Sequence, residues 1–133
     1  MKTFLDTGVL LSAWKRETLS ATALTVMAAD HREFYSSQMV RLELLPKPRF
    51  EKRSAEIRFY ENHLAGVVAS EPLSVELGNE AEALAARYGL SAADALQIAA
   101  AIRLGVEEFF TSEKPGKPMF RVKELKVISL HSL

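Results

Sequence analysis

The sequence predicts an α/β domain built around a central, mostly parallel sheet. Short apolar runs alternate with longer helical stretches along the whole chain, which is the pattern of βαβ units. Three of the helical stretches begin at serine and end at glycine or proline, residues that favour helix boundaries. Of the 133 residues, 48% are hydrophobic, enough to bury a core without disulfides. This length fits one domain, residues 1–133.

The strands are expected where short apolar or β-branched runs stand between helical stretches. Ligands of parallel sheets bind beyond the carboxyl ends of the strands. Asp6 and the turn at residues 111–113 directly follow such runs, so both are expected at the functional edge. The expected strands are residues 3–5, 34–36, 67–69, 108–111 and 126–130.

The helices are expected between these strands, with Ser37, Ser74 and Ser91 at their starts. Pro46 should end one of them, because the residue before a proline avoids helical dihedral angles. The last helix is apolar nearly all round and should therefore be buried. The expected helices are residues 9–14, 18–29, 37–45, 50–64, 74–89 and 92–104.

The overall composition excludes several classes of protein. Lys+Arg and Asp+Glu both number 17, so net charge argues neither for nor against a nucleic-acid partner. The absence of cysteine excludes disulfide scaffolds, cysteine-bound zinc and thiol catalysis. Asp6 interrupts any apolar signal core, and no apolar run approaches the roughly 20 residues that span a bilayer. A soluble, cytoplasmic protein without membrane contact is expected.

Two aspartates each fit a structural and a functional interpretation. Asp6 lies between apolar residues and suits a helix N-cap, which by itself is the stronger interpretation, although a capping Asp can also bind metal. Asp94 fits a capping box that begins at Ser91. It also stands at the N-terminal end of a buried helix, where the dipole favours an anion. For Asp94 the residues alone leave the cap and the site level.

Two glutamates complete the acidic set. A solvated face is the usual place of a helical glutamate, but Glu43 shares a helix face with Met39 and Val40, which weakens that alternative. Inside an apolar stripe its carboxylate should need a metal ion or a lysine to offset desolvation. Glu113 lies in a turn rich in lysine and proline, and alone it suggests a surface residue paired with a lysine.

As a set, the acids fit a site for a hard divalent cation, which prefers oxygen ligands. Clustered carboxylates repel each other unless a cation neutralises them, and such ions assist phosphodiester hydrolysis. Other chemistries fit poorly, because the three histidines are scattered and no Walker loop or serine elbow is present. An aspartate-nucleophile phosphatase would need a second Asp where the chain has Gly8.

Four segments stand out in order along the chain: Phe-Leu-Asp-Thr-Gly-Val-Leu-Leu-Ser-Ala-Trp at 4–14, Leu-Glu-Leu-Leu-Pro at 42–46, Leu-Ser-Ala-Ala-Asp-Ala-Leu-Gln-Ile-Ala-Ala-Ala at 90–101 and Phe-Phe-Thr-Ser-Glu at 109–113. Together they resemble the motifs of the PIN-domain family. This resemblance covers essentially the whole chain and implies a three-layer α/β/α fold with Mg²⁺- or Mn²⁺-dependent ribonuclease activity. Small stand-alone members are often VapC-like toxins, which an antitoxin encoded beside them silences.

The resemblance also implies roles for single residues. Asp6, Glu43 and Asp94 match the core acids that bind the metal and carry catalysis. Glu113 stands where the family usually has Asp, and would be the fourth metal ligand. Thr7 and Ser112 would position the attacking water, although simple capping and turn formation is the stronger interpretation of both.

Local charge indicates where RNA would approach. Residues 47–58 and 111–126 each hold five basic residues against two acidic ones, and each follows a proposed site residue. An ordinary solvated face is the alternative, and for residues 47–58 it is slightly favoured. The expected RNA contacts are Lys47, Arg49, Lys114 and Lys117.

A homodimer and a cognate antitoxin are the expected protein partners. Apolar side chains at residues 9–14 or 21–27 would supply such a surface, and core packing explains them as well. The rival function is a catalytically weak or inactive PIN-like module that binds RNA or protein without cutting. The substitution at Glu113 and the neutral net charge motivate that rival.

Overall fold

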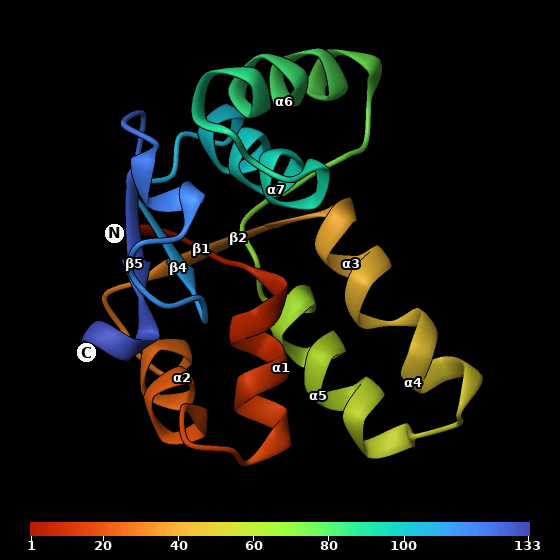
Figure 1. Cartoon of the computed structure of the whole chain (residues 1–133). Coiled ribbons are helices and arrows are strands. Elements are labelled where there is room, and N and C mark those ends of the chain that lie inside the picture. The colour runs from red at the N-terminus through yellow and green to blue at the C-terminus, as the bar shows by residue number, and fades with distance from the viewer.

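The computed structural model describes residues 1–133, and its centre is a five-stranded parallel sheet with strand order β3-β2-β1-β4-β5. Helices α6 and α7 cover one face, and α1, α2 and α5 cover the other (Figure 1), so the predicted three-layer α/β/α architecture is confirmed. The strands are β1 Lys2–Leu5, β2 Glu33–Ser37, β3 Ser70–Glu71, β4 Glu108–Thr111 and β5 Lys126–Ser129.

Seven α-helices and two short 3-10 helices connect these strands. Ser37, Ser74 and Ser91 cap α3, α6 and α7 as predicted, each accepting a hydrogen bond from a backbone N–H three residues on. The helices are α1 Thr7–Lys15, α2 Ser20–Met27, α3 Gln38–Leu44, α4 Pro46–Phe50, α5 Ser54–Ala65, α6 Val75–Tyr88 and α7 Ala92–Arg103, with η1 Pro118–Arg121 and η2 Leu130–Ser132.

Two expected elements differ from the structure. The expected strand at 67–69 is β3 at Ser70–Glu71 instead, although backbone hydrogen bonds already join Val68 and Ala69 to β2. The expected helix at 50–64 begins only at Ser54, because residues 46–50 form the separate helix α4. Pro46 ends α3 as predicted and also starts α4, since proline suits the first turn of a helix.

The core lies between the sheet and its two helical layers. Phe4 and Phe109, on neighbouring central strands, stack with ring centroids 5.3 Å apart and are fully buried. Helix α7 is buried over most of its length, as its apolar sequence predicted, and its small alanines let it pack closely. None of the helices is both long and apolar enough to cross a membrane.

The sheet topology fixes where a ligand would bind. The chain passes from β1 outward to β2 and β3, then returns through α6 and α7 to β4 on the other side of β1. The strand order therefore reverses between β1 and β4. In parallel sheets, this reversal opens a crevice at the carboxyl ends of the two strands.

Candidate active site

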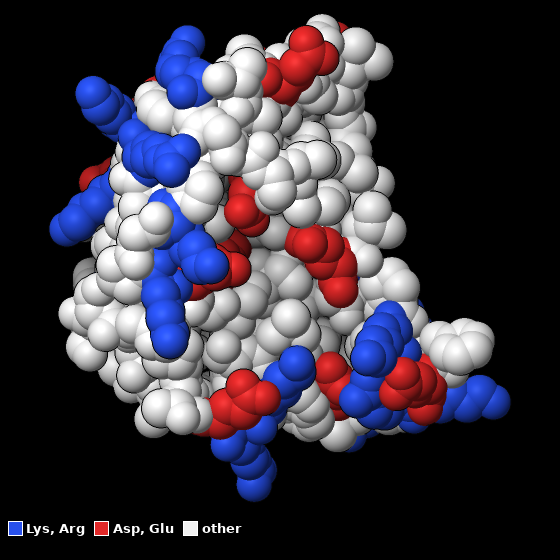
Figure 2. All heavy atoms as spheres, viewed as in Figure 1, with Lys and Arg blue, Asp and Glu red and all other residues white.

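The carboxyl ends of β1 and β4 carry two of the predicted site residues. Asp6 directly follows β1, and its backbone N–H donates to the Phe110 carbonyl of β4 at 3.1 Å. Glu113 lies two residues beyond β4. Figure 2 shows acidic side chains gathered in the hollowed centre of this face, with basic side chains around it. The sheet thus brings acids from distant parts of the chain to one edge.

Asp6 is both a helix cap and a buried acid. Its side chain accepts a hydrogen bond from the Val9 N–H at 3.1 Å, which starts α1, and the residue is only 8% exposed. Burial raises the pKa of Asp6 to about 7, and the charges of Asp94 and Glu113 add to the rise, whereas hydrogen bonds from Thr111 and Val9 oppose it. The capping hydrogen bond starts helix α1, but no positively charged side chain neutralises the Asp6 carboxylate.

Asp94 occupies the first turn of α7, where its own N–H donates to the Ser91 hydroxyl at 3.2 Å. The reciprocal hydrogen bond of a capping box, from the Ser91 N–H to the carboxylate, is absent. Burial raises the pKa of Asp94, the Ser91 hydroxyl lowers it, and the charges of Glu113 and Glu43 raise it further. The half-buried carboxylate therefore faces other acids rather than completing the cap.

Glu43 differs from its expected environment. The residue is exposed, so the expected burial in an apolar stripe is wrong for Glu43, although Val40 on the same face is fully buried. Its Oε1 accepts from the Thr7 hydroxyl at 2.7 Å and from the Gln97 amide. Neutral donors, rather than a lysine, hold this carboxylate.

Gln97 is the residue of this site that sequence reasoning missed. It is 5% exposed on α7; its Nε2 donates to the Thr7 hydroxyl at 2.9 Å, and its Oε1 accepts from the Thr7 N–H at 3.3 Å. One side chain therefore joins α7, the start of α1 and Glu43 of α3. The available signal was a lone amide in an otherwise apolar helix, three residues after Asp94.

Glu113 is exposed in the turn after β4, and it makes no ion pair with a lysine, contrary to the interpretation of that turn alone. Its backbone is fixed at two points: the N–H donates to the Thr111 hydroxyl at 3.1 Å, and the carbonyl accepts from the Ser129 hydroxyl at 2.6 Å. The side chain remains free while the loop beneath it is held.

Ser112 packs against the first turn of α1. A Cβ added at Gly8 would lie 2.1 Å from the Ser112 Oγ and 3.3 Å from the Ser112 Cβ, so a larger residue at position 8 requires the serine hydroxyl to move. This close approach holds the loop after β4 beside Asp6. The Thr7 hydroxyl donates to Glu43, and the water-positioning roles of Thr7 and Ser112 stay predictions.

The four acids have no basic partner. None of the chain's seven ion pairs involves Asp6, Glu43, Asp94 or Glu113. As the side chains stand, no three or more Asp, Glu or His residues converge as a ready-made metal shell. The oxygen donors fit a hard divalent cation in chemistry and charge. Closing a shell around one requires side-chain rotation, for which the exposed Glu113 has room.

The expected RNA-contacting residues occupy different environments. Lys47 lines a pocket that also includes Glu43, whereas Arg49 is held 2.5 Å from Glu61 in an exposed ion pair outside that lining. Lys114 and Lys117 are exposed in the loop that follows Glu113. Their contacts with RNA stay predictions.

The apolar residues considered for a dimer or antitoxin surface divide into two groups. Val9 and Leu10 are fully buried in the core, so they offer no surface. Leu24 on α2 is 42% exposed, and Trp14 is only partly buried. A homodimer stays a prediction.

Comparison with known structures agrees with this fold. The chain resembles VapBC2 from Rickettsia felis, solved with a promoter DNA fragment, with a TM-score of 0.71 and 17% identity over 97% of this chain and 98% of that one. It also resembles Mycobacterium tuberculosis VapC20, a sarcin-ricin loop cleaving toxin, with a TM-score of 0.69 and 19% identity over 93% and 98%. VapBC-1 from nontypeable Haemophilus influenzae gives 0.70 and 18% over 98% and 99%.

At these identities the solved structures establish the shared fold. By sequence, no curated protein matches the chain. The model of the PIN domain, however, matches residues 3–114, which span the proposed acids from Asp6 to Glu113. The chain therefore belongs to the PIN domain family.

Proposed function

We propose that this protein is a divalent-metal-dependent endoribonuclease that acts in the cytoplasm as the toxin of a toxin–antitoxin pair. The observation that carries the proposal is the cluster of Asp6, Glu43, Asp94 and Glu113 at the switch point of the sheet, without any lysine or arginine to neutralise it. A pKa of about 7 at Asp6 is in keeping with that missing charge. Structural relatives that include VapC20, described as a sarcin-ricin loop cleaving toxin, support the direction of the proposal.

The site residues have distinct roles in this proposal. Asp6 and Asp94 would hold Mg²⁺ or Mn²⁺ from the ends of β1 and α7, and Glu113 would add a ligand from its loop. Glu43 would orient the ion or the attacking water while Thr7 and Gln97 fix its position. A bound divalent ion would polarise the scissile phosphate and lower the pKa of a water molecule.

The deciding experiment combines cleavage with a charge-only variant. Purified protein is incubated with RNA in Mn²⁺ or Mg²⁺, with and without EDTA, beside Asp6→Asn. Asparagine caps a helix as well as aspartate does, so this variant keeps the cap and loses only the charge. Cleavage should stop in EDTA and fall at least about 100-fold in the variant, because even outer-shell changes at metal sites lower activity 10–100-fold. Cleavage that withstands both treatments contradicts the mechanism.

A second measurement needs no RNA. Mn²⁺ should raise the melting temperature of the wild type but not of Asp6→Asn, because a ligand that binds only the folded state stabilises it. Metal-dependent stabilisation without cleavage of any RNA would favour the rival function, a PIN-like binding module. Glu113 in place of the expected Asp, and side chains that do not yet converge on one ion, are the observations behind that rival.

The toxin role has its own test. Expression in a bacterial host should arrest growth, and co-expression of the neighbouring gene should restore it. Asp6→Asn should be harmless at the same protein level. Harmless expression of active wild type would contradict the toxin role while leaving the nuclease intact.

A further inference from the structure

A pocket of about 560 Å³ continues from the acidic cluster between α1, α3, α4 and the start of α5. Glu43 lines one end of it, so a strand of nucleic acid that leaves the carboxylates would enter this pocket next. In Figure 2 it lies below the central hollow, where basic side chains stand at the lower ends of α1 and α4. We name it the α1–α4 pocket.

The charge of the α1–α4 pocket is opposite to that of the acidic cluster. Four basic residues line it against two acidic ones, Glu43 and Glu56. Of the four, Arg53 already pairs with Glu51 at 3.1 Å and Glu56 at 3.3 Å. The other three, Lys15, Arg16 and Lys47, take part in no ion pair. Three free cations are therefore available to phosphate.

The floor of the pocket offers an aromatic ring that suits a base. Trp14 lines it, and its indole packs against Phe59 at a ring-centroid distance of 5.5 Å. Glu56 is 5% exposed and offers no free acceptor, because its Oε2 accepts from the Tyr60 hydroxyl at 2.7 Å and its Oε1 pairs with Arg53 at 3.3 Å. A fixed aromatic ring beside free cations matches a nucleotide, which combines a stacking face and a phosphate.

The backbone at Arg16 adds an independent observation. Arg16 ends α1 in the left-handed region with φ 53° and ψ 40°, a conformation that favours glycine. The strain is retained at a residue whose side chain lines the pocket. Lys52 is the only other non-glycine residue with positive φ, at 56°, and it lies outside the pocket lining. The two basic residues form a natural pair for comparison.

We propose that the α1–α4 pocket binds one nucleotide of single-stranded RNA next to the bond that is cut, with Arg16, Lys15 and Lys47 on its phosphates and Trp14 against its base. The assignment rests on the proposed function, since it places the substrate of that same site. An acidic protein segment would also meet the cations. The indole ring of Trp14, which lines the pocket and packs against Phe59, favours the nucleotide because a base can stack on it.

The test measures binding in the absence of cleavage. The probe is a fluorescently labelled oligoribonucleotide of about five nucleotides, roughly the smallest site of a single-strand binding fold. Protein is titrated into this probe in EDTA, and fluorescence anisotropy gives the Kd. The proteins compared are the wild type, Arg16→Gly and Lys52→Gly. Both variants lose one positive charge and relieve one strained residue, so both should keep or raise the melting temperature. Only Arg16→Gly should weaken binding, by roughly 5-fold. The slope of the logarithm of the binding constant against the logarithm of the salt concentration should also be smaller by about 0.7, because one phosphate contact is lost.

Two further variants keep the test independent of Arg16. Lys47→Gln should weaken binding by a similar factor, whereas Arg49→Gln, at the exposed pair with Glu61, should not. Trp14→Leu should weaken binding about 10-fold if a base stacks on the indole. Equal affinities within both matched pairs would overturn the proposal.

A competitor distinguishes the two kinds of occupant. A glutamate-rich peptide that displaces the RNA and binds more tightly, with the same dependence on Arg16 and Trp14, would overturn the nucleotide assignment in favour of a protein segment. Failure of the nuclease proposal looks different, since RNA then binds through the pocket in EDTA but is not cut in Mn²⁺. If Arg16→Gly instead cleaves RNA with an unchanged KM, the proposal that the pocket binds RNA is contradicted and the nuclease proposal is unaffected.

Discussion

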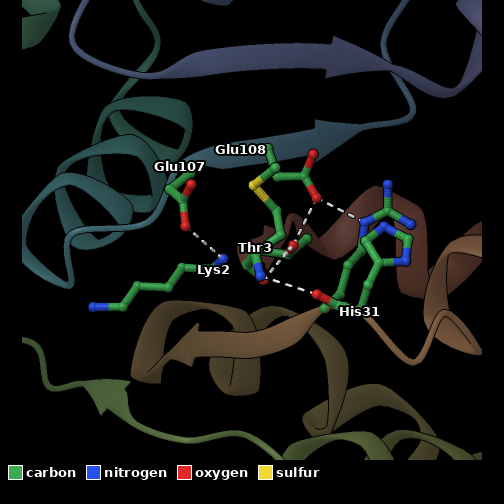
Figure 3. A network of polar contacts seen from close by, with 7 residues as sticks. Lys2, Thr3, His31, Glu107 and Glu108 are labelled. Carbon is green, nitrogen blue, oxygen red and sulfur yellow. Dashed lines mark hydrogen bonds and ion pairs between the residues drawn. The ribbon is translucent and has the colours of Figure 1, made fainter.

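Buried acidic residues at the two ends of the sheet have different partners. At the amino end, Glu108 is 7% exposed, and its Oε1 accepts from the Thr3 hydroxyl at 2.7 Å and from the Arg32 guanidinium at 2.7 Å (Figure 3). Glu107 beside it accepts from the Lys2 backbone N–H at 3.0 Å. At the carboxyl end, Asp6 is similarly buried, and no cation accompanies it. The buried acid at the amino end therefore has a cationic partner, and the buried acid at the carboxyl end has none.

The difference separates acids that have a cationic partner from acids that have none. Arg32 also lies over the Phe110 ring, 5.0 Å from its centroid, so the amino end holds its charge pair without help from solvent. The carboxyl end keeps several carboxylates near one another, an arrangement that a cation must stabilise. The same side-chain chemistry thus stabilises the fold at one end and is left available for a ligand at the other.

The largest expected effect is a pH-dependent gain in stability for Asp6→Asn without divalent metal. The folded pKa of Asp6, about 7, lies above its unfolded value of 3.8. The folded state therefore keeps a proton that the unfolded state has lost, and stability falls as pH rises from about 4 to 7. The uncharged asparagine of the variant escapes this loss, which amounts to up to about 4 kcal/mol.

Urea unfolding of both proteins in EDTA from about pH 3 to pH 8, a range that brackets both pKa values, measures the effect. The two stability curves should meet at the acidic end and separate toward the alkaline end, with the variant above. A variant that is less stable than wild type at the alkaline end would mean that the carboxylate has a cation partner after all, and the contrast between the two ends would fail.

The next largest effect is expected at Asp94, where two variants separate the role of its charge in cleavage from the capping of helix α7. Asp94→Asn keeps the helix start and should lower RNA cleavage at least about 100-fold. Ser91→Ala removes the hydroxyl that accepts the Asp94 N–H, and should lower stability by about 1 kcal/mol with cleavage per folded molecule unchanged. The opposite assignment of these two effects, measured by initial rates and denaturant unfolding, would make Asp94 a structural acid.

The paired end gives the third prediction. Glu108→Gln leaves the mostly buried Arg32 guanidinium without its counter-ion, and should destabilise the fold by about 2 kcal/mol, below the range for fully buried pairs because Arg32 is partly exposed. Denaturant unfolding measures this loss. Cleavage per folded molecule should be unchanged, since the substitution lies at the far end of the sheet. A variant that stays stable but loses activity would show that this end also serves function.

The smallest effect is expected at Gln97. Gln97→Met preserves volume but removes the amide that joins Thr7 and Glu43, and should slow cleavage about 10-fold, the lower end for outer-shell partners. Thr7→Val removes the other donor to Glu43 and should act similarly. The double variant, assayed for rate at saturating RNA, should lose little more than either single variant because both act through one carboxylate. Full additivity would contradict that shared route.

Much of this fold is readable from local pattern. The serine caps at residues 37, 74 and 91 were predictable because a short hydroxyl side chain satisfies a free N–H at a helix start. The central strands were predictable because both of their faces are buried, which produces continuous apolar runs. Helix α4 was not, since Pro46 both ends one helix and starts the next, and a sequence shows only the first of these effects.

The candidate site was predictable in its members but not in its contacts. Asp6 and the turn at 111–113 were placed by strand ends alone, whereas Glu43 was expected among apolar neighbours and is instead exposed. The spacing placed Val40 in the core correctly, but the hydrogen-bond partners of Glu43 lie on other helices, which the spacing within α3 does not reveal. Gln97 was missed for a related reason, since its partners lie on α1 and α3, far away in sequence.

The contact between Gly8 and Ser112 implies a constraint across related sequences. The Ser112 Oγ fills the volume that a Cβ at position 8 would need, so the two positions share one space. Side-chain size at one should vary inversely with size at the other, and a relative with alanine in place of Gly8 should carry glycine in place of Ser112. Covariation at this pair would then mark the distance between the two acid-bearing loops as the quantity under selection.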